Sequence, residues 1–316
     1  MRVVFCGSGE FATPSLRACR DAGHDIAIVA TQPARHAGRG GQLRPTPVAV
    51  AGAELGLNVV ECPNINDPAM IERLREAAAD AMIVADFGQM VRLEARKSVR
   101  IDAFNLHGSL LPDLRGAAPI NWAIIKGYET TGVTTFSLVD RMDAGDVYLR
   151  LSTQIARRET AGELKARLAQ LGAQAVLQTL DMLGGNPPAV PTPQDDSLAT
   201  KAPGLKKCDG VIDWNLPAAT IRNLVHGTWP WPGARTLFVS GERRIEVTLA
   251  RCDASGGHGG DAPAGQLRDD LSVQTGEGRL TVLEIKPAGK RLMEWHDFAN
   301  GYRVRQGDRF VSLEQA

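Results

Sequence analysis

Short apolar runs alternate with amphipathic segments through the first half of the chain, and this alternation constrains the fold more than any other feature. The strand-like runs are RVVFCG, DIAIVAT, LNVVEC, DAMIVADF, AFNLH and GVTTFSLV. Segments with helical periodicity at 11–21, 47–56 and 68–79 separate the first of them. Such repeats predict a mostly parallel sheet with crossover helices, and strands that are apolar along their whole length predict a sheet covered on both faces. We therefore predict a doubly wound, Rossmann-like α/β fold.

The chain changes character after a long helical segment at 159–183. The stretch GGNPPAVPTPQDDSLATKAPG is dense in Pro and Gly and has no hydrophobic period, which is typical of a linker. Beyond it, ARTLFVS, RRIEVTLA, LSVQTG and LTVLEIK are short strands between Gly-rich turns. These patterns predict a catalytic domain at 1–187, a linker at 188–206, and a smaller β-barrel domain of OB-like type at 207–316.

The charge balance and the cysteines exclude several classes of protein. Lys and Arg total 36, as do Asp and Glu, so an RNA-binding surface would have to come from local asymmetry. The five cysteines are scattered and lack CxxC spacing, which favours reduced thiols in a cytosol over a zinc site or a disulfide framework. The sequence shows no signal peptide and no apolar run long enough to span a membrane. We expect a cytoplasmic protein with no metal.

The segment GSGEFA, from Gly7 to Ala12, follows the first predicted strand and matches G-x-G-x-x-A. This pattern is typical of a turn that binds a dinucleotide. Such binding also needs an acidic residue at the end of the second strand, where this chain has Thr31 and Gln32. The alternative is that the glycines permit a tight turn. We therefore expect no NAD, although outward-pointing amides in this turn would suit some other ligand.

The stretch AFNLHGSLLPDLRGAAPINW holds the strongest catalytic candidates. Asn105 and His107 leave one face of an extended strand because they are two residues apart. An amide donor beside an imidazole suits a developing oxyanion and a proton transfer. Asp143, in RMDAGDVY past the next strand, is placed to orient the imidazole or to accept a proton through water. A structural histidine is the alternative, whereas a hydrolase built on Ser109 lacks the G-x-S-x-G pattern.

A basic segment, TQPARHAGRGGQLRPTPV, follows the second predicted strand. No acidic residue occurs between Asp25 and Glu54. Gly and Pro predict an extended loop without regular structure here. The loop is either a solvated surface or a contact for phosphate, since arginine matches phosphate bidentately. Its candidate residues are Arg35, Arg39 and Arg44.

Together, these segments resemble the methionyl-tRNA formyltransferase family. The likeness runs in order from VVFCGSGEFA to GDRF and includes DGVIDW, WPWPGA and KPAGKR. It implies transfer of the formyl group of 10-formyltetrahydrofolate to the α-amine of initiator methionyl-tRNA, for translation initiation. Folate and tRNA are then the partners, with no metal, NAD or membrane, and we expect a monomer.

Residue by residue, the resemblance implies that Asn105, His107 and Asp143 are catalytic and that the basic loop binds tRNA, with Arg39 entering the acceptor stem. It places folate against the segment 85–91 and the turn near Gly116. The implied folate-binding residues are Phe87, Gly88, Ser109, Leu110, Leu111, Pro112 and Gly116.

Several positions depart from the family pattern. In the folate loop the family usually has a small or apolar residue at Asp86, a Tyr at Phe87 and a Pro near Arg92, and in the basic loop it usually has a Pro at His36. The changes in the folate loop concern the contacts to the pterin. An amino-sugar nucleotide or a glycinamide ribonucleotide is an alternative acceptor. A nucleotide-binding or RNA-binding protein without catalysis is an alternative of another class.

Overall fold

The structure is a computed structural model that describes residues 1–37, 41–256 and 262–313. It divides into two compact units. Unit 1 comprises 1–119, 131–153 and 165–202, and unit 2 comprises 120–130, 154–164 and 203–316. The chain therefore passes between the units more than once. The domain boundaries suggested by composition stay a prediction.

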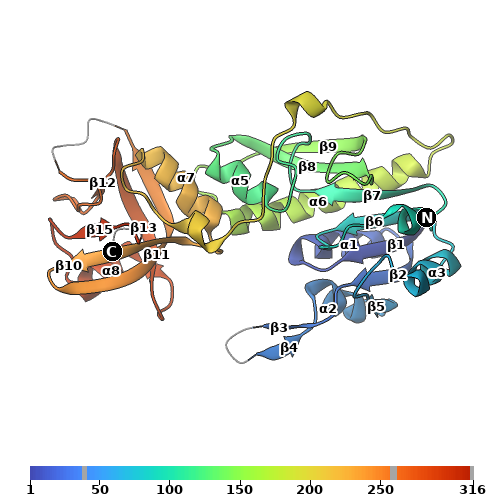
Figure 1. The fold of residues 1–316 in the computed structure, drawn as a ribbon, viewed down its shortest axis with the longest axis horizontal. Helices are drawn as coiled ribbons and strands as arrows, with labels where there is room; N and C mark the ends of the chain where they lie inside the picture. Colours follow the sequence, from blue (N-terminus) through green and yellow to red (C-terminus); the bar gives the residue numbers. More distant parts are fainter. Residues whose placement is uncertain (38–40, 257–261, 314–316) are drawn as a thin grey trace. The chain divides into compact units, whose positions relative to one another are not determined.

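A seven-stranded sheet forms the centre of unit 1, in the order β5-β2-β1-β6-β7-β8-β9 (Figure 1). The strands from β5 to β7 pair in parallel, and β7 pairs with β8 in antiparallel orientation. The predicted mostly parallel α/β sheet is thus confirmed. The strands are β1 (Arg2–Gly7), β2 (Asp25–Thr31), β5 (Val59–Glu61), β6 (Ala81–Ala85), β7 (Asp102–His107), β8 (Thr130–Ser137) and β9 (Val147–Gln154).

The helices in the first half begin and end where the sequence supplies the appropriate residues. Proline lies in the first turn of each of the first three helices, where its fixed φ is compatible with the helix and its missing N–H costs nothing. Thr46 caps the second by accepting a hydrogen bond from the amide of Ala49 at 3.0 Å. The helices that precede unit 2's barrel are α1 (Thr13–Asp21), preceded by the 3₁₀ turn η1 (Glu10–Ala12), α2 (Pro47–Glu54), α3 (Pro68–Glu76), α4 (Leu93–Arg96), α5 (Pro119–Ile125) and α6 (Ala161–Leu183).

The basic segment is not the irregular loop that the sequence predicted. It forms a two-stranded antiparallel hairpin of β3 (Arg35–Ala37) and β4 (Gln42–Arg44). The prediction was wrong because the glycines and prolines lie outside the paired residues, where they do not interrupt the ladder.

Unit 2 contains a nearly closed antiparallel sheet in the order β12-β13-β11-β10-β15 (Figure 1). Bridges from Gln266 to Arg309 and from Leu267 to Val273 connect its two ends, which confirms the predicted barrel-like second domain. Trp214 stacks on Phe310 in its core, with ring centroids 5.3 Å apart. The elements are α7 (Ala218–Thr228), β10 (Ala234–Ser240), β11 (Arg243–Ser255), β12 (Val273–Gln274), β13 (Arg279–Pro287), β14 (Met293–Glu294), α8 (Trp295–Tyr302) and β15 (Arg309–Val311).

The Pro-rich stretch predicted as a linker has little regular structure, but it is hydrogen-bonded to other segments of unit 1. It contains the 3₁₀ turn η2 (Asp196–Leu198), and the 3₁₀ turn η3 (Lys207–Gly210) follows it. Thr192 exchanges two backbone hydrogen bonds with Val147 at the start of β9. The part of the stretch up to residue 202 belongs to unit 1. The connecting role stays a prediction, but the absence of a hydrophobic period did not prevent this stretch from packing.

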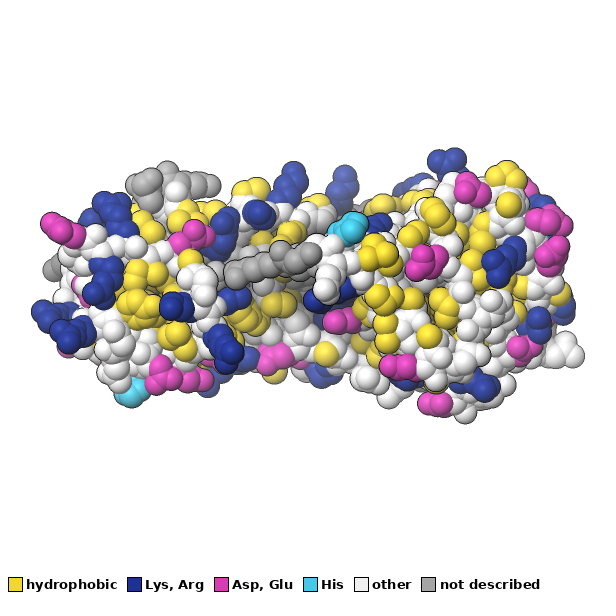
Figure 2. All heavy atoms as spheres, turned by 90° about the horizontal axis from the view of Figure 1, so that it is seen from below, with side chains coloured by type: hydrophobic (Ala, Val, Ile, Leu, Met, Phe, Trp, Pro, Cys, Tyr) yellow, Lys and Arg dark blue, Asp and Glu magenta, His cyan; other side chains and the backbone are white. Residues whose placement is uncertain are grey.

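The surface agrees with the balanced composition. Side chains of both charge signs are interspersed over the face drawn in Figure 2. Four of the five cysteines are buried thiols, and Cys208 is exposed. Within the ranges that the structure describes, no helix is both long and apolar enough to cross a membrane.

Candidate active site

The carboxyl end of β7 carries the predicted Asn105 and His107. This strand lies between β6, its parallel partner, and β8, its antiparallel partner. Open α/β sheets bind ligands beyond the carboxyl ends of their strands. The side chain of His107 is only 6% exposed, and its ring lies edge-on to Phe136 with the ring centroids 6.5 Å apart. Asn105 is half-buried, and across the described residues its side-chain amide has no hydrogen-bond partner. That amide is therefore available to a ligand.

The carbonyl of Leu114 orients the His107 ring. His107 Nε2 lies 3.0 Å from this oxygen. A carbonyl only accepts hydrogen bonds, so Nε2 carries the proton and donates it. Leu114 lies in the turn after β7 and has a φ of 59°, in the left-handed region. The hydrogen bond leaves Nδ1 as the ring nitrogen that can act on a substrate.

Asp143 meets His107 across the sheet edge. Its Oδ2 lies 3.8 Å from His107 Nδ1, which is longer than a hydrogen bond. The same oxygen accepts a hydrogen bond from the amide of Gly116 at 2.8 Å. Asp143 itself has a φ of 52°, and its side chain is 13% exposed. The structure therefore brings together a buried imidazole and an anchored carboxylate, from β7 and from the loop after β8. A pair of this kind can stabilise charge and move a proton.

The residues implied in folate binding divide into two groups. Ser109 is buried, and its hydroxyl donates to the carbonyl of Asp113 at 2.6 Å. Leu111 is buried against Phe136. These two side chains are engaged within the protein and shape the turn after β7. Phe87 is also buried. The remaining predicted positions are half-buried or exposed, and they are Gly88, Leu110, Pro112 and Gly116.

The G-x-G turn does not offer the free amides that the sequence suggested. The amides of Ser8 and Gly9 donate to the carbonyl of Asp86 at 3.0 and 3.1 Å. The side-chain carboxylate of the exposed Asp86 lies over Gly9, in the space that a Cβ at this position would occupy. Asp86 Oδ2 also lies 3.3 Å from the ammonium of Lys165. The expectation of outward-pointing free amides was wrong for these two residues, because both amides are hydrogen-bonded to the Asp86 carbonyl.

Two of the three candidate tRNA residues, Arg35 and Arg44, lie on the hairpin. Arg35 and Arg44 are directly opposite each other in the ladder, and both are exposed. Arg35 donates to the side chain of Gln32. Arg39 lies outside the described residues. Like charges placed opposite each other in a ladder repel, so this pair concentrates positive charge on the exposed hairpin.

The sequence analysis did not identify Leu114 and Arg115, which lie in the turn after β7. It also did not identify Gln194 and Thr200, which are hydrogen-bonded to that turn or to the Asp143 loop. Gln194 and Thr200 lie in the Pro-rich stretch, where no period or motif distinguishes them. Hydrogen bonding across more than fifty residues leaves no local signal.

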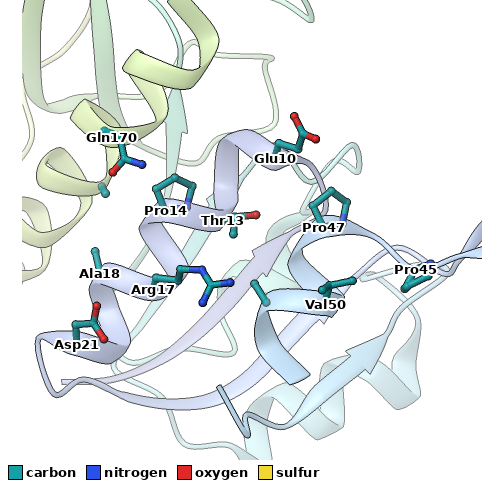
Figure 3. A pocket seen from close by; sticks show the side chains of 12 residues that line it. Glu10, Thr13, Pro14, Arg17, Ala18, Asp21, Pro45, Pro47, Val50 and Gln170 are labelled. Atoms are coloured by element: carbon teal, nitrogen blue, oxygen red, sulfur yellow. The ribbon is translucent and has the colours of Figure 1, made fainter. Parts of the chain in front are cut away.

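An open cleft of about 740 Å³ lies elsewhere in unit 1, among α1, α2 and α6 (Figure 3). Pro14, Pro45, Pro47, Val50 and Arg17 line it. Arg17 is paired with Glu54. Of the described residues that line this cleft, none belongs to the predicted catalytic set. Within the described ranges there is also no cluster of side chains suited to hold a metal ion.

Comparison with known proteins agrees with this architecture. Residues 1–180 match the family described as formyl transferase, and residues 204–303 match its C-terminal domain. The chain is 41% identical over 314 residues to a methionyl-tRNA formyltransferase of Solibacter usitatus, covering 98% of each chain. It is 39% identical over 307 residues to one of Citrifermentans bemidjiense, covering 97% of this chain and 95% of the relative. HypX from Aquifex aeolicus, solved in complex with tetrahydrofolic acid, shares the fold with a TM-score of 0.60 at 17% identity, covering 97% of this chain and 48% of HypX.

Proposed function

The chain belongs to the formyl transferase family, and from this premise we propose that it transfers the formyl group of 10-formyltetrahydrofolate to the α-amine of methionine on initiator tRNA. The product is N-formylmethionyl-tRNA, used in translation initiation. The observation that carries the proposal is the full-length likeness to methionyl-tRNA formyltransferases. The His107–Asp143 pair and the free amide of Asn105 support it.

Formyl transfer needs groups that stabilise an oxyanion and move a proton. The neutral amine attacks the formyl carbon, a C–N bond forms, and the formyl oxygen becomes negative. In the proposal, the Asn105 amide donates to that oxygen. When His107 Nδ1 also carries a proton, the imidazolium donates to the same oxygen, and the Asp143 carboxylate lies 3.8 Å from its charge.

The second half of the reaction breaks the bond between the formyl carbon and N10 of the folate. The attacking amine must lose a proton, and N10 must gain one, so protons and charge balance. In the proposal, Asp143 accepts the amine proton through water and His107 takes part in returning it to N10. Leu114 and Gly116 keep the two side chains in place through their backbone groups.

The acceptor distinguishes this function from the alternatives. The exposed arginines of the hairpin and the barrel-like unit 2 favour a large anionic acceptor, because a small amine needs neither. In this proposal, Arg35, Arg39 and Arg44 contact the phosphates of the tRNA. A cytoplasmic location and a monomeric state belong to the same proposal, and light scattering of the purified protein tests the latter.

The deciding experiment incubates the protein with 10-formyltetrahydrofolate and charged initiator tRNA, followed by mass analysis of the released amino acid. We expect a mass gain of one formyl group on methionine. Parallel reactions contain glycinamide ribonucleotide or an amino-sugar nucleotide. Formylation of either of these without reaction of the tRNA would replace the proposed acceptor.

A calorimetric titration with NAD(H) tests the cofactor. We expect no binding at the G-x-G turn because the carbonyl of Asp86 accepts from the amides of Ser8 and Gly9. Micromolar binding of NAD(H) would contradict this expectation.

A further inference from the structure

We propose that residues 192–202, here called the strap, set the geometry of the catalytic pair, with Thr200 and Gln194 as its two positioning residues. The inference rests on the proposed formyl transfer and extends it to a segment that no motif marks. Neither side chain is hydrogen-bonded to the His107 ring or to the Asp143 carboxylate. Gln194 is hydrogen-bonded to the backbone of Asp143, and Thr200 is hydrogen-bonded to the backbone of Leu114, whose carbonyl orients the His107 ring.

Thr200 acts on His107 through Leu114. Its hydroxyl oxygen accepts a hydrogen bond from the Leu114 amide at 2.8 Å, and its hydroxyl donates to Asp113 Oδ1 at 3.2 Å. The carbonyl of the same Leu114 accepts from His107 Nε2 at 3.0 Å. The amide and the carbonyl of Leu114 belong to adjacent peptide units, so in this proposal a displacement of Thr200 is transmitted through the Leu114 backbone to the carbonyl that orients the ring.

Gln194 acts on the Asp143 loop. Its Nε2 donates to the carbonyl of Asp143 at 2.9 Å and to that of Gly145 at 2.6 Å. Its Oε1 accepts from Arg115 Nε at 3.2 Å and from Arg115 Nη2 at 2.8 Å. The side-chain amide thus joins the loop that carries Asp143 to the turn after β7.

Two further contacts join the strap to the turn after β7 and to the Asp143 loop. The Asp196 carboxylate lies 2.8 Å from Arg115 Nη2 and 2.9 Å from Arg141 Nη2, and Arg141 is on the Asp143 loop. Gly116 lies so close to the strap that an added Cβ would be 2.5 Å from the Ala202 carbonyl. The amide of Gly116 donates to Asp143 Oδ2, so this close approach also bears on the carboxylate.

The backbone conformations show why such support is needed. Leu114 and Asp143 both have positive φ, at 59° and 52°, without being glycine. Such conformations persist only where the surrounding structure enforces them, and they are typical of functional sites. The strap supplies side-chain hydrogen bonds to both residues. Because a misplacement of about 1 Å costs about 100-fold in rate, the chemical step depends on these bonds.

The test compares paired variants of the full chain in the tRNA formylation assay. Thr200→Val removes the hydroxyl at nearly constant shape, and Thr200→Ser restores it. Gln194→Ala removes the side-chain hydrogen bonds to Arg115 and to the Asp143 loop. Gln194→Glu keeps an acceptor for Arg115 but loses both donors to the Asp143 loop. Gln170→Ala, in α6, is the matched control, since among the described residues its amide has no hydrogen-bond partner.

We expect kcat to fall about 10-fold to 100-fold in Thr200→Val, Gln194→Ala and Gln194→Glu, with KM for folate and tRNA within about 3-fold of wild type. Thr200→Ser should recover most of kcat, and Gln170→Ala should match wild type. The pH dependence of kcat should move in the impaired variants, because the pair that handles the proton is displaced. Thermal unfolding, followed by circular dichroism, verifies that each variant is folded.

The outcomes separate this inference from the proposed function. No transfer by the wild type overturns the proposed function and the strap's role with it. Transfer by the wild type with unchanged kcat in Gln194→Glu and Thr200→Val overturns the strap's role alone. The strap's role is also overturned if activity falls only in proportion to the amount of folded protein and the pH dependence of kcat is unchanged. The strap would then be merely structural.

Discussion

The turn after β7 and the basic hairpin both carry residues implied in function, but they are built in opposite ways. In the turn, His107 is buried and hydrogen-bonded to Leu114, and Asp143 is fixed by the amide of Gly116. In the hairpin, Arg35 and Arg44 face each other exposed on two short strands. Chemistry at a single carbon needs donors fixed before the substrate arrives. Contact with phosphates needs accessible charge that adapts to its partner.

The largest effect is expected at the catalytic pair. His107→Ala and Asp143→Asn should each lower kcat by about 10³-fold while the protein stays folded. The double variant should be scarcely worse than the more damaging single, because both groups act on one proton transfer. Single-turnover kinetics measure this. Fully additive losses would show that the two residues act independently and would remove the basis for treating the turn as one unit.

Asn105→Ala should have the next largest effect. Loss of one oxyanion donor costs about 10²-fold in kcat. The free energy of unfolding should change little, because the Asn105 side chain makes no hydrogen bond within the described part of the chain that the change could break. Urea unfolding and steady-state kinetics on the same preparation check both statements. A large fall in stability would mean that Asn105 is structural.

The hairpin should respond in the opposite sense, with changed tRNA binding and an unchanged chemical step. Arg39→Ala and Arg35→Ala should raise KM for charged tRNA several-fold and lower the salt slope of binding by about one unit at most. The affinity for folate and the stability should stay near wild type. Arg20→Ala, an exposed arginine in the last turn of α1, is the matched control. Equal weakening of folate and tRNA binding would contradict a tRNA role and strengthen the small-acceptor alternatives.

The smallest effect is expected in the pH dependence of the free energy of unfolding. It defines the pH range in which the other variants should be measured. Burial, together with Arg222 and Arg251, lowers the pKa of His226 in unit 2 to about 4. Between this value and the usual pKa of histidine, the unfolded chain binds a proton that the folded chain does not. Stability is therefore full above the unfolded pKa and falls as pH decreases toward the folded one.

Urea unfolding at about pH 7.5 and about pH 5.5 should show a loss near 1 kcal/mol from this residue. His226→Gln, which keeps an acceptor for the amide of Cys252, should lack that part of the loss. An identical pH dependence in both proteins would show that His226 doesn't control it. Activity profiles that test the catalytic turn should then be interpreted only where the fold is unaffected.

Local pattern predicted most of the strands and several helices of unit 1, but it missed β9 and α5 as well as the hairpin. The apolar runs became the strands of the sheet, and the periodic segment at 68–79 became α3, because burial of a strand or of one helix face depends on nearby residues. The hairpin was missed because Gly and Pro were counted over the whole segment. Their positions, outside the paired residues of β3 and β4, decide whether a ladder forms.

The sequence by itself determined the α/β class, the β-rich second half, and the candidates Asn105, His107 and Asp143. Spacing on one strand placed the first two on a common face. Only the tertiary structure decided which groups hold these residues. The Leu114 amide and the Thr200 hydroxyl are 86 residues apart in the chain, and Gln194 and Asp143 are 51 apart. Such hydrogen bonds depend on where the chain returns after folding, and no local period or propensity encodes that return.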